Sequence, residues 1–251
     1  MGDGPTERAA LRKQAVRERV WAAMRDAGVD RFPGARGRIP NFLGAERAAE
    51  TLASTPEWRE ARVIKANPEA PQLPVRARAL AEGKVVYVAV PRLADDRPFL
   101  LLDPERIRVR PRAAASIRGA GAAGRPVRVD EVEHVDLVVC GSVAMNRAGA
   151  RIGKGGGYSD LEFALLTESG AVDDRSAIAT TVHPIQVLTG RLPETEHDFR
   201  VDLVATPDRV VRIGHRRRPP GILWNHLDQE RIEAIPELRR RLVGERRRLR
   251  R

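Results

Sequence analysis

The chain has 251 residues, a formal net charge of +11, and a composition that is 42% hydrophobic but only 4% aromatic. This length allows one large α/β domain with a sizeable core, alone or with an extension. The sequence has no apolar run long enough to cross a membrane and no signal-peptide pattern at its start. We therefore expect a soluble, cytoplasmic protein that does not bind a membrane.

Most of the positive charge lies at the C-terminal end. Residues 209–251 hold 14 arginines and five acidic residues, and so contribute nine of the eleven net charges. The remaining chain is nearly neutral and has too few aromatic residues for the stacking platform of a single-strand nucleic-acid binder. An Arg-rich C-terminal extension (214–251) that contacts RNA or another polyanion remains an alternative.

The cysteine and histidine pattern argues against a zinc site or a thiol nucleophile. Cys140, the one cysteine, lies in an apolar run, where it is expected to pack as a small hydrophobic side chain. The five histidines show no H-x-x-x-H spacing.

The first half of the chain is predicted to alternate helices with strands. An N-terminal helix over 6–25 is indicated by Thr6 as its N-cap, Gly28 after its end, and an apolar stripe at helical spacing. The stripe consists of Leu11, Ala15, Val16, Val20 and Met24. The further elements are a helix beginning at Asn41, strands at 62–66, 85–90 and 99–102, a helix ending at Gly83, and a Gly/Ala-rich segment at 113–124 that is a helix or a mobile lid.

The second half continues the alternation. Its predicted elements are strands at 135–141, 177–182, 200–204 and 209–213, a helix at 161–168, and a last helix at 228–251 broken or kinked at Pro236. The pattern predicts a three-layer, Rossmann-like α/β domain with a mainly parallel sheet over 1–213. Ligands in such folds collect at the carboxyl ends of the strands.

Residues 151–160, RIGKGGGYSD, are the most informative segment. Four glycines within five positions let the backbone approach a ligand and direct N–H groups at an anion, at the positive end of the following helix. Lys154 adds a mobile cation, and Asp160 adds a carboxylate suited to a phosphate-bound Mg²⁺. The Gly-Lys-Ser/Thr of a P-loop is absent, and Tyr158 stands where a dinucleotide fingerprint needs glycine. The segment therefore predicts a nucleotide-phosphate loop of another kind, with a turn that binds no ligand as the alternative.

Residues 136–160 resemble the 5-formyltetrahydrofolate cyclo-ligase family, also called methenyltetrahydrofolate synthetase. That family has a hydrophobic strand, a short connection and then R-[LI]-G-x-G-x-G-[YF]-[YF]-D; Ser159 replaces the second aromatic here. The segments 141–165 and 38–42 are more similar to a divergent branch, the methenyltetrahydrofolate-synthetase-domain-containing proteins.

Three weaker motifs extend the resemblance from about residue 10 to 213. Residues 13–17 (KQAVR) match the family's K-x-x-[LV]-R, which places a lysine and an arginine on one helix face. Glu69 stands 14 residues before Gly83, as in the family, and Ile64 occupies the apolar substrate position five residues earlier. Residues 201–204 (VDLV) match a V-D-x-[VL] strand.

The resemblance implies ATP- and Mg²⁺-dependent closure of 5-formyltetrahydrofolate to 5,10-methenyltetrahydrofolate, with release of ADP and phosphate. It also implies a fold broadly shared with sugar-phosphate isomerases and CoA transferases. The residues it assigns to the nucleotide are Lys13, Arg17, Arg151, Ile152, Gly153, Lys154, Gly155, Gly156, Gly157, Tyr158 and Ser159, of which Arg151 and Lys154 act in catalysis. Ile64 and Glu69 would contact the folate, with Glu69 on the pterin N–H edge, and Asp160 and Asp202 would hold Mg²⁺.

Several alternatives remain open from the residues alone. Lys13 and Arg17 fit a solvated helix face, and Glu69 fits a charge at a helix start. Asp202 lies in an apolar strand, where a carboxylate needs a partner. At the level of function, the chain could be a non-catalytic nucleotide-binding relative with an RNA-binding tail, or a sugar-phosphate isomerase or acyl-CoA transferase relative that needs no ATP. We expect a reduced folate or related pterin and ATP as small-molecule partners, and a monomer or homodimer.

Overall fold

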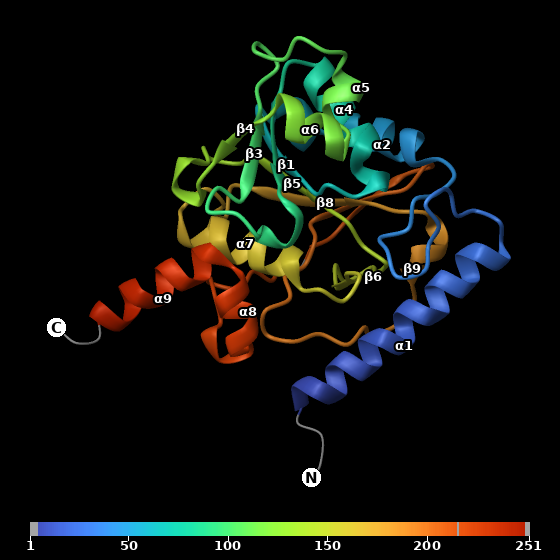
Figure 1. Cartoon of the computed structure of the whole chain (residues 1–251). Coiled ribbons are helices and arrows are strands. Elements are labelled where there is room, and N and C mark those ends of the chain that lie inside the picture. Colours follow the sequence, from blue (N-terminus) through green and yellow to red (C-terminus); the bar gives the residue numbers. More distant parts are fainter. Residues whose placement is uncertain (1–4, 215, 249–251) are drawn as a thin grey trace.

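A mainly parallel eight-stranded sheet forms the centre of the computed structural model, which describes residues 5–214 and 216–248 (Figure 1). Its strands are β1 (Val63–Ala66), β2 (Val85–Ala89), β3 (Phe99–Leu102), β4 (Arg125–Val127), β5 (Leu137–Cys140), β8 (Ala177–Thr181), β10 (Leu203–Ala205) and β11 (Val210–Arg212). Their order in the sheet is β11-β10-β8-β5-β1-β2-β3-β4. The five strands from β10 to β2 run parallel, and the pairings β10–β11, β2–β3 and β3–β4 at the two edges are antiparallel. The predicted α/β class and mainly parallel sheet are therefore confirmed.

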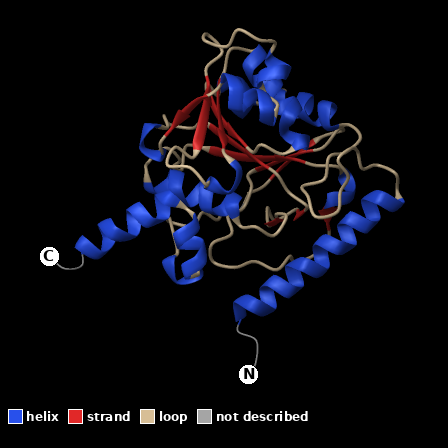
Figure 2. Cartoon of the chain, in the orientation of Figure 1, coloured by secondary structure: helices blue, strands red, loops and turns tan. Residues whose placement is uncertain are grey.

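Helices cover both faces of this sheet (Figure 2). The α-helices in the described residues are α1 (Pro5–Asp26), α2 (Ala45–Ala53), α3 (Pro56–Glu60), α4 (Leu73–Ala81), α5 (Pro111–Ala114), α6 (Ile117–Ala123), α7 (Tyr158–Glu168), α8 (Gln229–Ala234) and α9 (Pro236–Arg248). The helices α2, α4, α5 and α6 lie on one side, whereas α7, α8 and α9 lie on the other. Among the described residues, no helix is both long and apolar enough to cross a membrane.

Strand β1 shows how the two faces are divided. Successive side chains of a strand point to opposite faces. Ile64 and Ala66 are buried in the cluster that contains α2 and α4. Val63 is buried in the cluster that contains α7, and Lys65 is bonded to Glu162 of α7. The odd-numbered positions of β1 therefore face the helix that follows the glycine-rich loop.

A small second sheet carries the chain from β5 into the glycine-rich loop. It consists of β6 (Ala144–Asn146), β7 (Arg151–Ile152) and β9 (Val187–Leu188). Gly149 turns the β6–β7 hairpin with φ 84°, and a Cβ there would lie 2.7 Å from the carbonyl oxygen of Val201. Val20 and Trp21 of α1 pack in the same cluster as Ile152 of β7. This packing brings α1 to the loop.

The N-terminal helices differ in detail from the prediction. Helix α1 is confirmed, but only part of its predicted stripe is buried: Leu11 is 59% exposed. The second helix begins at Ala45 rather than Asn41, after Gly44 with φ 91°. The Asn41 side chain instead donates to the carbonyl of Phe32 and so holds the preceding loop. A local capping pattern cannot distinguish these two uses of asparagine.

The C-terminal helices pack on the same body as the sheet. Pro236 divides them into α8 and α9, as predicted. Ile232, Ile235 and Leu238 are buried in the cluster that contains α7. A domain boundary at 213/214 stays a prediction, but the segment up to Leu238 is folded against the α/β domain.

Candidate functional site

A cavity of about 520 Å³ opens beside the glycine-rich loop. Asn67, Val90 and Gly141 line it, and these residues follow β1, β2 and β5 directly. The cavity therefore lies at the carboxyl ends of adjacent parallel strands, as ligand sites in this class of fold do. The loop contributes Gly153, Lys154 and residues 156–160 to the same cavity.

The loop conformation depends on its glycines. Gly155 has φ 114° and Gly157 has φ 64°, values that residues with a Cβ rarely adopt. Gly157 is the N-cap of α7, so the loop meets the positive end of that helix. The predicted strand–loop–helix arrangement is confirmed. The loop backbone has the placement that anion-binding helix N-termini share.

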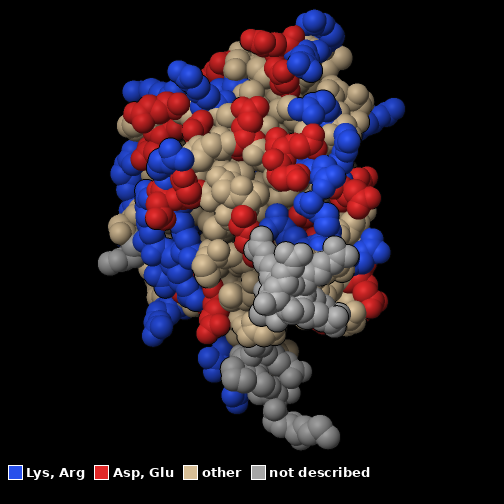
Figure 3. Space-filling model, turned by 90° about the vertical axis from the view of Figure 1, so that its left-hand side faces the viewer, with Lys and Arg blue, Asp and Glu red and all other residues tan. Residues whose placement is uncertain are grey.

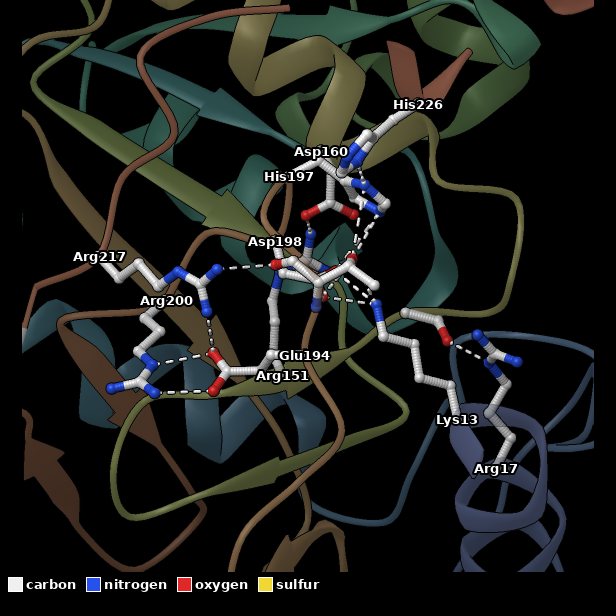
Figure 4. Close-up of polar contacts among 12 residues, drawn as sticks. Lys13, Arg17, Arg151, Asp160, Glu194, His197, Asp198, Arg200, Arg217 and His226 are labelled. Atoms are coloured by element: carbon white, nitrogen blue, oxygen red, sulfur yellow. Dashed lines mark hydrogen bonds and ion pairs between the residues drawn. The ribbon is translucent and has the colours of Figure 1, made fainter. Parts of the chain in front are cut away.

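Helix α1 brings Lys13 and Arg17 to the loop (Figure 4). Arg17 donates from Nε to the carbonyl oxygen of Gly153 at 2.7 Å. Lys13 donates to Oδ1 of Asp198 at 2.7 Å. Burial disfavours the ionised form of Asp198, but the Lys13 ammonium and hydrogen bonds from Thr195 outweigh it, and the pKa of Asp198 lies below its usual range. Arg17 thus contacts the loop directly, Lys13 is held beside it by Asp198 and Thr195, and neither side chain belongs to a solvated helix face.

Lys154 and Glu69 meet at the cavity. Lys154 Nζ lies 2.8 Å from Oε1 of Glu69. Burial opposes ionisation of Glu69, yet the Lys154 ammonium and hydrogen bonds prevail, so the pKa of Glu69 is lowered. The second carboxylate oxygen, Oε2, is buried and has no hydrogen-bond partner among the described residues. Glu69 therefore presents an ionised acceptor without a donor, which is costly unless a ligand supplies one.

Arg151 and Asp160 form a pair beneath the loop. Arg151 Nη2 lies 2.6 Å from Oδ1 of Asp160, and the guanidinium lies 4.1 Å from the ring centre of Phe199. Burial lowers the pKa of Arg151, but Asp160 and other negative groups raise it by more. The pKa of Arg151 therefore lies above its usual value, and the guanidinium stays charged. Arg151 is 3% exposed and does not line the cavity, whereas Asp160 does. The structure thus places Arg151 as the support of Asp160, and its assignment to the nucleotide stays a prediction.

Ile64 and Asp202 lie away from both the glycine-rich loop and the cavity. Ile64 points to the α2/α4 side of the sheet, opposite to α7. Asp202 precedes β10, at the amino end of the parallel strands, where it accepts from the backbone N–H of Ile178 and from Arg218 at 2.8 Å. Asp202 therefore has the partners that a carboxylate in an apolar strand requires, and the geometry does not pair it with Asp160 at a metal.

Three further predicted site residues, Ile152, Tyr158 and Ser159, belong to the loop or to the strand before it. Ile152 is buried in β7, where it pairs with Ala144. The Ser159 hydroxyl accepts a hydrogen bond of 3.4 Å from Asn67 Nδ2. Ser159 and Tyr158 line the cavity.

A buried ion pair at the floor of the cavity was not predicted. Lys65 of β1 contacts the Glu162 carboxylate of α7 and donates to Oδ1 of Asn67 at 2.9 Å. Both charged side chains are almost completely buried. Burial raises the pKa of Glu162 despite the neighbouring ammonium. The signal in the sequence was a lysine inside an otherwise apolar strand, but its partner lies 97 residues away.

Arg76 holds the turn that carries Glu69, and it was also missed. This buried residue of α4 donates to the carbonyl oxygens of Pro68 at 3.0 Å and Glu69 at 3.1 Å. It also donates to the carbonyl of Ala115 at 2.8 Å. One guanidinium therefore satisfies backbone acceptors of the turn and of the 113–124 segment together.

The side chains at the loop could hold Mg²⁺ only if a bound ligand supplied further oxygen atoms. No group of three His, Cys, Asp or Glu side chains suited to a metal occurs in the part of the chain that the structure describes. Asp160 is the carboxylate at the loop, and its Oδ1 already holds Arg151. Mg²⁺ in phosphate sites is commonly held by one or two carboxylates, water and substrate phosphates. Asp160 fits that arrangement, but an all-protein magnesium site does not.

Many C-terminal arginines are neutralised within the molecule. Arg216 and Arg218 pair with Asp202, and Arg241 pairs with Glu168 at 2.6 Å. On the face shown in Figure 3, acidic side chains lie among the basic ones. The described part of the extension therefore offers less free positive charge to a polyanion than its composition indicates.

Three kinds of comparison place the chain among known proteins. A model of the 5-formyltetrahydrofolate cyclo-ligase family matches residues 7–207. Methenyltetrahydrofolate synthase domain-containing proteins of Bos taurus and Homo sapiens are 39% and 36% identical, over 92% and 90% of this chain and 62% and 60% of theirs. The chain thus spans less than two thirds of the length of these relatives. The NMR structure of Aquifex aeolicus 5,10-methenyltetrahydrofolate synthetase is 22% identical, with a TM-score of 0.51 over 82% of this chain and 94% of that one, which supports the fold alone.

Proposed function

Because the chain belongs to the 5-formyltetrahydrofolate cyclo-ligase family, we propose that it converts 5-formyltetrahydrofolate to 5,10-methenyltetrahydrofolate at the cavity beside the loop, with ATP and Mg²⁺. One observation carries the proposal. The same cavity is lined by a glycine-rich loop suited to phosphate and by Glu69, a carboxylate suited to a heterocyclic N–H group, whose buried Oε2 has no hydrogen-bond partner among the described residues.

The reaction requires the ligands to be held in place more than it requires a protein nucleophile. In the proposed reaction, the formyl oxygen attacks the γ-phosphorus of ATP and ADP leaves. N10 of the folate then adds to the formyl carbon and loses its proton, and inorganic phosphate leaves with the former formyl oxygen. Both steps depend on positioning and on neutralisation of phosphate charge.

The residues have distinct roles in this proposal. The N–H groups of the loop, with Lys154 and Arg17, bind the triphosphate; each charge-assisted bond is worth about 1.5–3 kcal/mol. Because Lys154 contacts Glu69 at 2.8 Å, it would also link the phosphate end of the site to the pterin end. When bound, Mg²⁺ would reduce the repulsion between the phosphate oxygens and the incoming formyl oxygen. Asp160, oriented by Arg151, is the carboxylate that would hold it through phosphate and water.

The test is the appearance of the near-ultraviolet absorbance of methenyltetrahydrofolate when the protein is mixed with Mg·ATP and 5-formyltetrahydrofolate. We expect a signal that requires ATP and is lost in Asp160→Ala and in Glu69→Ala. Asp174→Ala is a matched control, because Asp174 does not line the cavity. ATP binding without turnover would leave a phosphate loop with another substrate, and absence of both would refute the proposal.

Binding of RNA by the C-terminal segment is not favoured as a second function. Arginines of this segment are bonded to acidic side chains or to backbone carbonyls of the domain, as described for Arg218 and Arg241. Isomerase or acyl-transfer chemistry on a phosphosugar or a CoA thioester would be indicated by retention of such a ligand without any affinity for ATP.

A further inference from the structure

The C-terminal segment reaches the glycine-rich loop through Arg231 of α8. The Arg231 guanidinium donates to the carbonyl oxygen of Gly156 and lies 4.9 Å from the ring centre of Tyr158. A Cβ on Gly157 would lie 3.3 Å from its Nη1. One side chain from beyond the family-matched residues 7–207 therefore touches three consecutive residues of the loop.

The segment that carries Arg231 is held firmly against the domain. The Asp228 carboxylate accepts from the backbone N–H of Arg231 at 2.7 Å and so caps α8. Ile232 is buried in the core, and His226 Nδ1 lies 2.9 Å from His197 Nδ1. The guanidinium is thus presented to the loop by packed structure and not by a loose tail (Figure 4 shows the His197–His226 contact).

Arg17 occupies the corresponding position on the other end of the loop. It holds the carbonyl of Gly153 at 2.7 Å, and a Cβ on Gly155 would lie 3.5 Å from its Cζ. The two guanidiniums thus bracket the four loop glycines, Arg17 from α1 and Arg231 from α8.

The two bracketing arginines differ from the other cations at the loop. Lys13, Arg151 and Lys154 each pair with a carboxylate. Within the described residues, Arg17 and Arg231 form no ion pair with a carboxylate, and each holds a loop carbonyl instead. Bonds between a guanidinium and a phosphate are charge-assisted on both sides, and are stronger than bonds to a neutral carbonyl.

We propose that Arg231 is a phosphate-binding residue of the loop, supplied by the C-terminal segment, which binds the polyphosphate of a nucleoside triphosphate from the side opposite to Arg17. The inference rests on the proposed function, since it requires that the loop bind polyphosphate. On binding, the guanidinium exchanges the carbonyl of Gly156 for phosphate oxygens. Arg231 does not line the 520 Å³ cavity, but it lines a neighbouring cavity of about 50 Å³ together with Gly157 and Asp160, and these two residues line both cavities.

Arg231→Gln separates this role from that of a structural clamp. Glutamine keeps an N–H donor on a shorter side chain, but it carries no charge. We expect Arg231→Gln to weaken the binding of Mg·ATP and of inorganic triphosphate about tenfold or more, measured by titration calorimetry. The salt dependence of binding should also become smaller, because one cationic contact is lost. Arg239→Ala, an exposed arginine on α9, is the matched control and should bind as the unmodified protein does.

Each outcome decides a different question. Equal affinities of Arg231→Gln and the unmodified protein would assign Arg231 to the clamp role and overturn the inference, while the phosphate loop would stand. No binding of either probe by the unmodified protein would overturn the phosphate loop itself. If Arg231→Gln does not fold, Arg231→Lys carries the test: it keeps the charge but loses the bidentate geometry, so its affinity must fall while the salt dependence remains. Unchanged affinity in that variant would also overturn the inference.

Discussion

The buried pair of Lys65 and Glu162 allows a quantitative test of the cavity floor. Lys65→Met leaves the Glu162 carboxylate, which is 4% exposed, without its counter-charge. Removal of one partner of a buried pair typically costs about 3–5 kcal/mol, because the remaining charge is uncompensated. For a chain of this length, that corresponds to a fall of about 10 °C in the unfolding temperature. A double variant, Lys65→Met with Glu162→Leu, removes both charges and should recover most of the loss.

Thermal and denaturant unfolding, followed by circular dichroism, give the four stabilities of this cycle. Burial raises the folded-state pKa of Glu162 above its usual value, so the neutral carboxyl is the form that tolerates the loss of Lys65. The cost of Lys65→Met should therefore be small at acidic pH and grow as the pH rises through the folded-state pKa of Glu162. A single variant that loses less than about 1 kcal/mol at neutral pH, with no rescue in the double variant, would refute the reasoning.

Three further predictions concern the loop and its neighbours. Gly157→Ala should lower the free energy of unfolding by about 1–2 kcal/mol, because φ is 64° there; an unchanged denaturation midpoint would contradict this. Lys154→Ala should weaken ATP binding about tenfold in calorimetry, and equal affinities would remove Lys154 from the phosphate site. Asp198→Asn should make the free energy of unfolding less dependent on pH in the acidic range. The Lys13 ammonium lowers the pKa of Asp198, so its contribution is complete above about pH 4 and is lost as the pH falls through the folded-state pKa. If the free energy of unfolding of the variant falls with acidic pH as steeply as that of the unmodified protein, the pair of Lys13 and Asp198 does not stabilise the fold.

The sequence was most informative where local pattern and topology agree. The apolar runs at β2 and β5 could be placed because strands buried on both faces of a parallel sheet are continuously hydrophobic. The glycine-rich loop could be placed because several glycines between a strand and a helix indicate either a tight turn or a close approach of the backbone to a ligand. The cavity followed from these two facts, since ligand sites lie at the carboxyl ends of such strands.

What the sequence did not reveal depends on contacts between distant residues. Strand β7 has two residues and is recognisable only by its pairing with β6. Ile64 and Lys65 are adjacent, so an assignment one position away changes the face of the sheet that a side chain reaches. Asp202 required a partner, and the pattern could not show that this partner was Arg218 rather than a metal. The contact of Arg231 with the loop could not be predicted either, because nothing near Arg231 in the sequence indicates the loop that it touches.

Arg76 has a consequence for how a ligand is recognised at the Glu69 end of the cavity. Its guanidinium already holds the carbonyls of Pro68 and Glu69, so folding bears the entropic cost of ordering this turn. A ligand then meets a preorganised acceptor and does not have to immobilise the backbone that carries it, which favours affinity without any additional contact. Since the same guanidinium holds Ala115, the 113–124 segment shares this rigidity at its attachment point. If Glu69 binds the substrate as proposed, selectivity at this end of the cavity is set by a fixed template and not by a turn that adapts to its ligand.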